Sequence, residues 1–227
     1  MFKNLFLIGV LLIFLGCNLT NLNTKEDFSN EVPPEFNTHF LNPPKIKQFK
    51  DKHWVLQENF ILYIGLNDSD TGQQPSIEVP AGFVTDLASI PPPADLILDD
   101  WHRYASAAIV HDYMYWVQPC GKPGKRIADK IFKQSLKATK NSKIKAYLMK
   151  LFVSSNFGRK AWKSNLEKRN QGESRFIPEK LWPQIGDYNW KDFALKFPLK
   201  QLASEKVHRE NDLNSLKICK IFPKFND

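Results

Sequence analysis

The sequence predicts an α+β domain in which a small antiparallel β-meander packs on a helical hairpin, with a long third helix after it. Short runs of β-branched and aromatic residues, separated by polar turns, are typical of antiparallel strands. Longer stretches after these strands carry apolar residues at helical spacing. Aromatic residues make up 13% of the chain, which favours a packed core over disorder.

Four short strands are expected, over residues 53–56, 60–64, 76–79 and 82–85. The first two are β-branched and aromatic runs on either side of a polar turn. The third alternates polar and apolar residues in the manner of an edge strand, and Pro80 separates it from the fourth. Neighbours this close in sequence are expected to pair antiparallel.

Three helices are expected after the strands. Apolar side chains recur every three or four positions over residues 101–116, and Pro119 ends this helix. A second helix with the same periodicity is predicted over residues 125–138. The third begins near Ser142 and is interrupted near Gly158. The short connection makes the first two an antiparallel pair.

The N-terminus resembles that of bacterial lipoproteins. Lys3 precedes an apolar run too short to span a bilayer, and Phe14-Leu15-Gly16-Cys17 is similar to a lipobox. The resemblance implies a signal peptide over residues 1–16 and a lipidated Cys17. We therefore expect a protein of the bacterial cell envelope, anchored to membrane lipid through Cys17 on the outer-membrane or periplasmic side.

Three segments are expected after the signal peptide. Residues 17–45 are rich in Asn, Thr, Pro and Glu, which is typical of a flexible tether. Residues 46–171 form the core domain, and residues 172–227, punctuated by prolines, form an irregular extension. The net charge of +8 comes from basic residues that are spread out, so no nucleic-acid binding is expected.

Two cysteines remain once Cys17 is lipidated. An exported compartment permits a disulfide between Cys120 and Cys219, but the sequence leaves their pairing open. Neither a Cys-x-x-Cys nor a His-Glu-x-x-His pattern occurs, which disfavours a zinc finger or a zincin.

One cluster of polar residues has the spacing of a general base and its partners. His111 and Tyr115 are four residues apart and share a helix face. Asp129 lies at a similar height on the next helix, where its carboxylate would fix the tautomer of His111 and favour its protonated form. Arg126, one turn before Asp129, is expected to pair with that carboxylate or to hold a substrate anion.

Two further carboxylates belong to this cluster, and the cluster also has a purely structural interpretation. Asp112 and Asp86 are candidate oxygen ligands for a hard cation such as calcium. Asp86 equally suits an Asx turn before Pro91. A His111–Asp129 pair also serves as a purely structural hydrogen bond between two helices, and the sequence leaves these alternatives open.

Four motifs resemble the bacterial and phage domain-of-unknown-function family 1353. They are Gly-Phe-Val-Thr-Asp-Leu-Ala-Ser-Ile-Pro at residues 82–91, His-Asp-Tyr-Met-Tyr at 111–115, Arg126-x-x-Asp129-x-x-Phe132, and Phe157-Gly158-x-x-Ala161-Trp162. The likeness covers roughly residues 53–162. It implies a shared fold and site, whereas the activity of that family is not established.

A looser resemblance concerns the chemistry. His111-Asp112-x-x-Tyr115, with Asp129 after it on an antiparallel helix, is similar to the secreted phospholipase A-two superfamily. The resemblance implies that His111 activates water, that Asp112 holds calcium, and that Asp129, supported by Tyr115, orients His111. The glycine-rich calcium loop of that superfamily has no counterpart here.

The sequence therefore favours an envelope hydrolase with a His–Asp dyad that acts on phospholipid esters. The alternative is a non-catalytic, lipid-tethered binding or structural module in which the same cluster stabilises the fold. A divalent cation that binds the folded state would raise the melting temperature in the first case and not in the second.

Overall fold

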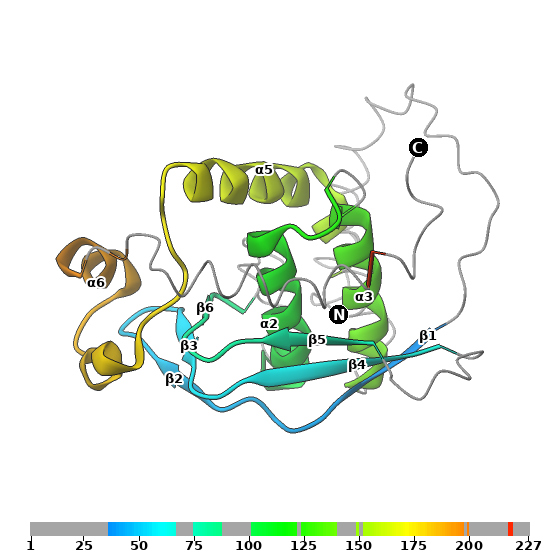
Figure 1. The fold of residues 1–227 in the computed structure, drawn as a ribbon, viewed down its shortest axis with the longest axis horizontal. Helices are drawn as coiled ribbons and strands as arrows, with labels where there is room; N and C mark the ends of the chain where they lie inside the picture. Colours follow the sequence, from blue (N-terminus) through cyan, green and yellow to red (C-terminus); the bar gives the residue numbers. More distant parts are fainter. Residues whose placement is uncertain are drawn as a thin grey trace, which may run out of the picture.

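Two three-stranded antiparallel sheets and several helices make up the described part of the chain, so the predicted α+β class is confirmed (Figure 1). The computed structural model describes residues 36–66, 75–87, 101–121, 124–139, 149, 152–197, 199 and 218–219. Within this part, no helix has the length and apolar character needed to cross a membrane. The predicted lipobox with Cys17, the predicted helix start at Ser142, and Pro91 lie outside the described residues.

The first sheet has the order β1-β4-β5, with β1 at Phe36–Phe40, β4 at Phe60–Leu66 and β5 at Ser76–Val79. Its alternate side chains are buried, as the two-residue period of a strand requires. The buried members are Phe36, Phe60, Leu62, Ile64, Ile77 and Val79. One face of this sheet therefore forms a wall of the core.

The second sheet has the order β2-β3-β6, with β2 at Ile46–Gln48, β3 at Trp54–Leu56 and β6 at Val84–Thr85. The expected antiparallel strands are divided between two sheets, because β4 pairs with β1 and β5 while β3 pairs with β2 and β6. The predicted tether extends too far. Phe36 in β1 is 2% exposed and pairs with Leu66, so ordered structure begins inside residues 17–45.

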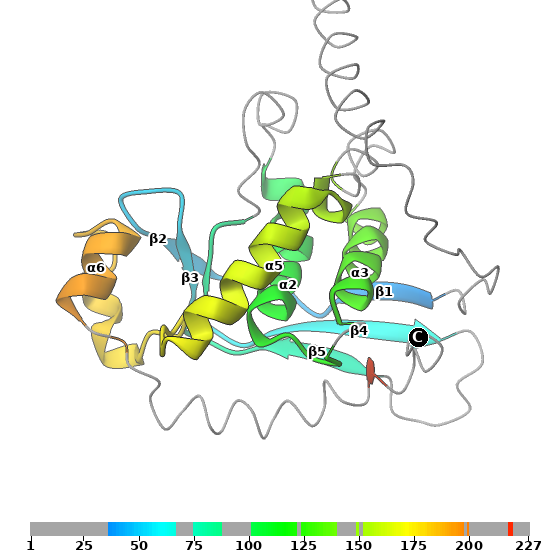
Figure 2. The ribbon, with the colours of Figure 1, turned by 90° about the horizontal axis from the view of Figure 1, so that it is seen from above.

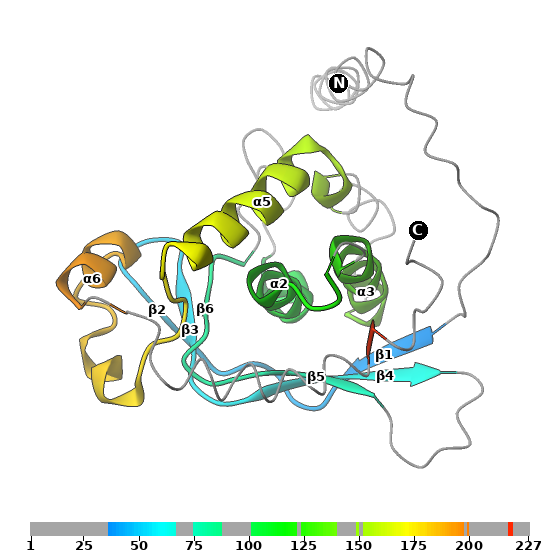
Figure 3. The ribbon, with the colours of Figure 1, turned by 45° about the horizontal axis from the view of Figure 1, so that its top comes forward.

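The predicted helical hairpin is present. Helices α2, Trp101–Val117, and α3, Gly124–Ala138, lie side by side over the first sheet (Figure 3). Both helices bury small residues, among them Ala107, Ala108 and Ala128, each with no exposed surface. Small side chains let the two backbones approach closely, and this proximity allows polar side chains on facing turns to meet.

Helix α5, Asn156–Asn170, crosses the C-terminal end of α2 (Figure 2). The last carbonyls of a helix lack intrahelical partners, and α5 supplies donors for them. Asn165 Nδ2 donates to the Tyr115 carbonyl at 3.3 Å, and Arg169 donates to the Trp116 carbonyl at 2.8 Å. Ser155 is the N-cap of α5.

The C-terminal segment is less irregular than predicted. It contains a 3₁₀ helix, η2, at Glu179–Gln184 and helix α6 at Trp190–Lys196, both beside the second sheet (Figure 1). Their aromatic side chains complete a second hydrophobic core, which consists of Phe49, Val55, Val84, Ile177, Ile185, Phe193 and Leu199. Residues of the C-terminal segment therefore pack on the second sheet, β2-β3-β6, and hold the chain that follows α5 against it.

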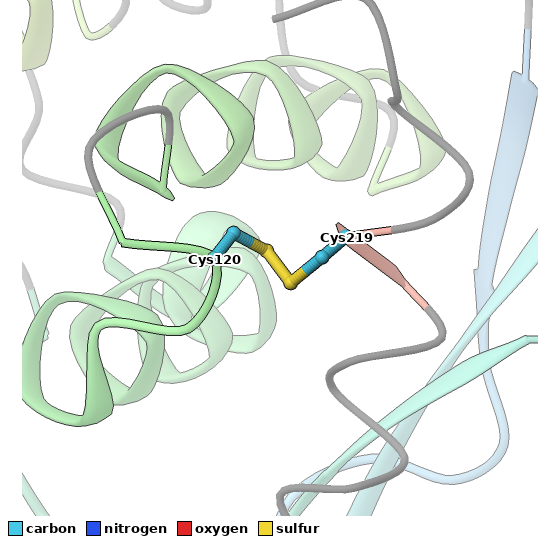
Figure 4. Close-up of a disulfide and its surroundings, with 2 residues drawn as sticks. All are labelled: Cys120 and Cys219. Atoms are coloured by element: carbon cyan, nitrogen blue, oxygen red, sulfur yellow. A yellow bond between two sulfur atoms is a disulfide. The ribbon is translucent and has the colours of Figure 1, made fainter. Parts of the chain in front are cut away.

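Cys120 and Cys219 form a disulfide, which settles the pairing left open by the sequence (Figure 4). The two residues are 99 positions apart, and their Cα atoms lie 5.3 Å from each other. Ile218, beside the second cysteine, has no exposed surface. The bridge thus holds a C-terminal segment against the loop between α2 and α3.

Candidate functional site

The predicted contact between His111 and Asp129 is present at the centre of the helical hairpin. His111 Nε2 lies 3.0 Å from Asp129 Oδ1, and the histidine is 5% exposed. Because an ionised carboxylate only accepts hydrogen bonds, Nε2 carries the proton that joins the two groups. The other ring nitrogen, Nδ1, makes no hydrogen bond to any described residue. The contact therefore selects the tautomer that leaves a lone pair on Nδ1.

Among the described residues, three side chains from two helices donate hydrogen bonds to Asp129. Besides His111, the Tyr115 hydroxyl donates to Oδ1 at 2.7 Å, and Lys125 Nζ donates to Oδ2 at 2.6 Å. Lys125 also donates to the Val153 carbonyl at 2.8 Å. Burial would raise the pKa of Asp129, but the hydrogen bond from His111 and the Lys125 ammonium outweigh burial and lower it. Asp129 is thus a fixed negative charge behind the imidazole.

The His111 ring is packed between two aromatic rings. The centroid distances are 4.1 Å to Tyr115 and 4.4 Å to Phe132. This burial lowers the pKa of His111 more than the neighbouring Asp129 raises it. The expectation that the carboxylate would favour a protonated ring is therefore wrong, because removing the ring from water outweighs the charge of its partner. His111 is neutral at pH 7.

This lowered pKa predicts that His111 destabilises the fold on acidification. The unfolded chain binds a proton at His111 near 6.5, whereas the folded chain binds it only at lower pH. Stability should therefore fall as the pH drops below about 6.5. Urea denaturation of wild type and His111→Gln, compared between about pH 5 and 8, should show the steeper loss in wild type. Parallel curves, or a wild type that gains stability in acid, would contradict the assignment.

His111 lies at a pocket of about 330 Å³, a size typical of small-molecule sites. Its lining combines polar and apolar side chains. The described lining residues are Asp86, His111, Asp112, Tyr115, Asn165 and Arg175, together with Phe152, Val153, Phe157, Gly158 and Ala161. The imidazole thus has access to a cavity that could hold an amphiphilic molecule.

Asp112 and Asp86 are brought together in this pocket, as predicted. Thr85 Oγ1 donates to Asp112 Oδ2 at 2.5 Å, and it accepts the Leu87 backbone N–H at 3.0 Å. Burial raises the pKa of Asp112 well above its usual range, and the negative charge of Asp86 adds to this rise. The pair is therefore electrostatically suited to share one proton or to bind one cation.

The pair fits a hard cation in chemistry but supplies only part of a coordination shell. Calcium takes about six to eight oxygen ligands. Among the described residues, no group of three or more His, Cys, Asp or Glu side chains is arranged to hold a metal ion. Asp86 and Asp112 would hold calcium through their carboxylates, and backbone and water oxygens would have to complete the shell.

The cation next to Asp129 is Lys125, not Arg126. Arg126 is exposed and is not among the described residues that line the pocket. Lys125 lies four residues before Asp129 on α3, and this spacing brings its ammonium to the carboxylate. The same rule applied to Lys125 would have found it from the sequence. Arg175 was also missed, because it lies in the segment predicted to be an irregular extension.

Gly158 is required by the close approach of α5 to the pocket wall. A Cβ at this position would lie 1.8 Å from the Val153 carbonyl oxygen, which accepts the hydrogen bond from Lys125. Adjusting that backbone would disturb the support of Asp129. The Phe157-Gly158 motif therefore serves the geometry of the site.

Gly158→Ala should consequently destabilise the protein, although alanine is ordinarily the better helix former. We expect the free energy of unfolding to fall by about 1–3 kcal/mol, the range seen for overpacked sites. Lys160→Ala, at an exposed position of α5, serves as the control and should change stability by less than about 0.5 kcal/mol. A higher urea midpoint for Gly158→Ala would show that the close approach is absent.

Residues 64–153 match the family model described as protein of unknown function (DUF1353). The predicted resemblance to this family is confirmed over this segment. The DUF1353 segment contains both the His111–Asp129 pair and the Asp86–Asp112 pair, whereas α5 and Arg175 lie beyond it. No curated protein and no solved structure gives a significant match to the chain. The description of this family names no activity, so the function of the protein has to be inferred from the geometry of the site.

Proposed function

We propose that the protein is a lipid-anchored hydrolase of the bacterial cell envelope in which His111 is the general base. One observation carries the proposal. Asp129 fixes the Nε2–H tautomer of a neutral imidazole, and the same imidazole lines a pocket. A neutral ring with an accessible lone pair is the form that takes a proton from water. A structural hydrogen bond alone does not require a pocket at the ring.

The proposed reaction begins with water hydrogen-bonded to His111 Nδ1. The nitrogen takes a proton as the water oxygen attacks an ester carbonyl, and the imidazolium that forms is stabilised by Asp129. The tetrahedral intermediate then breaks the bond to the alcohol, which receives the proton from Nδ1. Calcium held by Asp86 and Asp112, when bound, would supply positive charge for the developing oxyanion.

Phospholipid esters are the proposed substrates. The pocket lining includes apolar residues that suit an acyl chain, namely Phe152, Val153, Phe157 and Ala161. A lipid anchor at Cys17 would place the domain at a membrane. The Cys120–Cys219 disulfide supports an exported location, because such bridges persist in oxidising compartments.

Fatty-acid release from phospholipid vesicles tests the proposal. His111→Ala and Asp129→Asn should both lose most of the activity of the wild type. The chain offers a matched control in a second His–Asp pair, where His53 Nδ1 lies 3.1 Å from Asp51 Oδ2 away from the described pocket lining. His53→Ala and Asp51→Asn should retain activity. Release equal to wild type in both site variants would remove the proposal.

The burial of His111 favours a second candidate, a non-catalytic lipid-tethered module. A ring that is 5% exposed and packed between two aromatic rings also suits a structural network. In that case the site variants lower the melting temperature sharply, and calcium leaves the melting temperature of the wild type unchanged. A clear upward shift with calcium, lost in Asp112→Asn, would count against this candidate.

A further inference from the structure

The backbone of Arg175 is held against β6, next to the candidate site. The Val84 backbone N–H donates to the Arg175 carbonyl at 2.8 Å, and the Ile177 N–H donates to the Gly82 carbonyl at 2.9 Å. A Cβ on Gly82 would lie 2.5 Å from the Ile177 carbonyl oxygen, so a glycine is needed for this approach. The sequence block that contains Gly82 and Thr85 thus positions a residue far later in the chain.

The side chain of Arg175 contacts an aromatic ring, and no described residue accepts a hydrogen bond from it. Its guanidinium lies 5.3 Å from the centroid of the Trp116 ring, in cation–π contact. It forms no hydrogen bond or salt bridge with a described residue, and it lines the pocket beside His111 and Asp112. An oriented guanidinium whose donors are not used by any residue that the structure describes is suited to bind a planar pair of anionic oxygens.

We propose that Arg175 binds the phosphate group of an amphiphilic ligand whose apolar part lies against Phe152, Phe157 and Ala161. This inference deepens the proposed function by assigning the residue that selects a phosphate-bearing substrate. An anion entering this pocket meets Asp86 and Asp112, and Arg175 supplies the positive charge that offsets them. A guanidinium, unlike an ammonium, gives two parallel donors to one phosphate.

Binding of a short-chain diether phosphatidylglycerol to the purified full chain tests this role. The ether bonds resist ester hydrolysis, so binding is measured separately from catalysis. Isothermal titration should show at least about tenfold weaker binding for Arg175→Ala, and an intermediate loss for Arg175→Lys. Arg126→Ala is the matched control, because Arg126 is an exposed arginine outside the described pocket lining, and it should bind like wild type.

Two further ligands identify which part of the lipid the protein recognises. Inorganic phosphate should bind more weakly than the diether lipid, and a diether glycerol without phosphate should show no dependence on Arg175. Equal affinity of wild type and Arg175→Ala for the diether lipid, with both proteins folded by circular dichroism, would overturn the proposal. So would an equal loss in Arg126→Ala. Lipid binding that depends on Arg175 in a protein without hydrolytic activity would support this role while removing the proposed function.

Discussion

Replacing His111 with glutamine is expected to lower fatty-acid release by about 10²–10⁴-fold, the range contributed by a positioned general base. Glutamine retains an N–H donor for Asp129 but has no basic lone pair at the position of Nδ1. The polar contact between the helices is therefore kept while the proton acceptor is lost. This variant separates catalysis from stability better than alanine, which would also leave a cavity between Tyr115 and Phe132.

Activity and stability have to be measured on the same preparations of His111→Gln. We expect the turnover number to fall while the urea midpoint at pH 7 changes little. Lys125→Met is an informative companion, because Lys125 supports Asp129 without lining the described part of the pocket. It should reduce activity less than His111→Gln does. Turnover by His111→Gln within about threefold of wild type would contradict a base role, which requires at least about a hundredfold loss.

Removing the Cys120–Cys219 disulfide is expected to cost about 3–5 kcal/mol of unfolding free energy. The bridge joins residues 99 positions apart, and cross-links that close long loops most restrict the unfolded chain. Cys219→Ser also releases a segment whose Ile218 is fully buried. Both effects lower the stability of the folded state relative to the unfolded one.

Urea denaturation of Cys120→Ser, Cys219→Ser and reduced wild type measures this contribution. The three should lose similar amounts of stability, because all of them lack the same bridge. The reducing agent should have no further effect on either serine variant. A loss below about 1 kcal/mol in all three would show that the C-terminal segment contributes little to the fold, against the expectation for a long loop.

The helical hairpin could be predicted because the residues that indicate it are close together in the sequence. The periodicity of α2 and α3 and their short connection place His111 and Asp129 at similar heights, and the structure has them in contact. Strand β1 could not be found in the same way. It is five residues long, and its partner β4 begins twenty residues after it ends. Its place in the sheet therefore depends on hydrogen bonding to a distant strand and not on its own pattern of apolar residues.

The site residues also differ in how far apart in the sequence the elements that bring them together lie. His111, Tyr115 and Asp129 lie on two adjacent helices, and their grouping follows from helical spacing. Arg175 reaches the pocket only because the chain returns to β6 after α5, where Phe83 and Phe176 form a bridge. No sequence spacing encodes that return, so Arg175 could not be predicted as a pocket residue from a segment that lacks periodicity.

The protonation state of His111 also required the structure. The sequence supplied the charge of Asp129, which raises the pKa of the imidazole, but not the burial of the ring. Whether a neighbouring carboxylate or desolvation prevails depends on the packing of Tyr115 and Phe132 around the ring. Side-chain packing of this kind is set by the whole core.

Nitrogen-15 NMR of His111 at pH 7 tests the site most directly, because it reports both the charge and the tautomer of the ring. We expect a neutral imidazole with its proton on Nε2, hydrogen-bonded to Asp129, and an unprotonated Nδ1. The assignment is made by comparison with His111→Gln. A doubly protonated ring, or a neutral ring with its proton on Nδ1, would leave no lone pair for water in the pocket and would contradict the proposed role of His111.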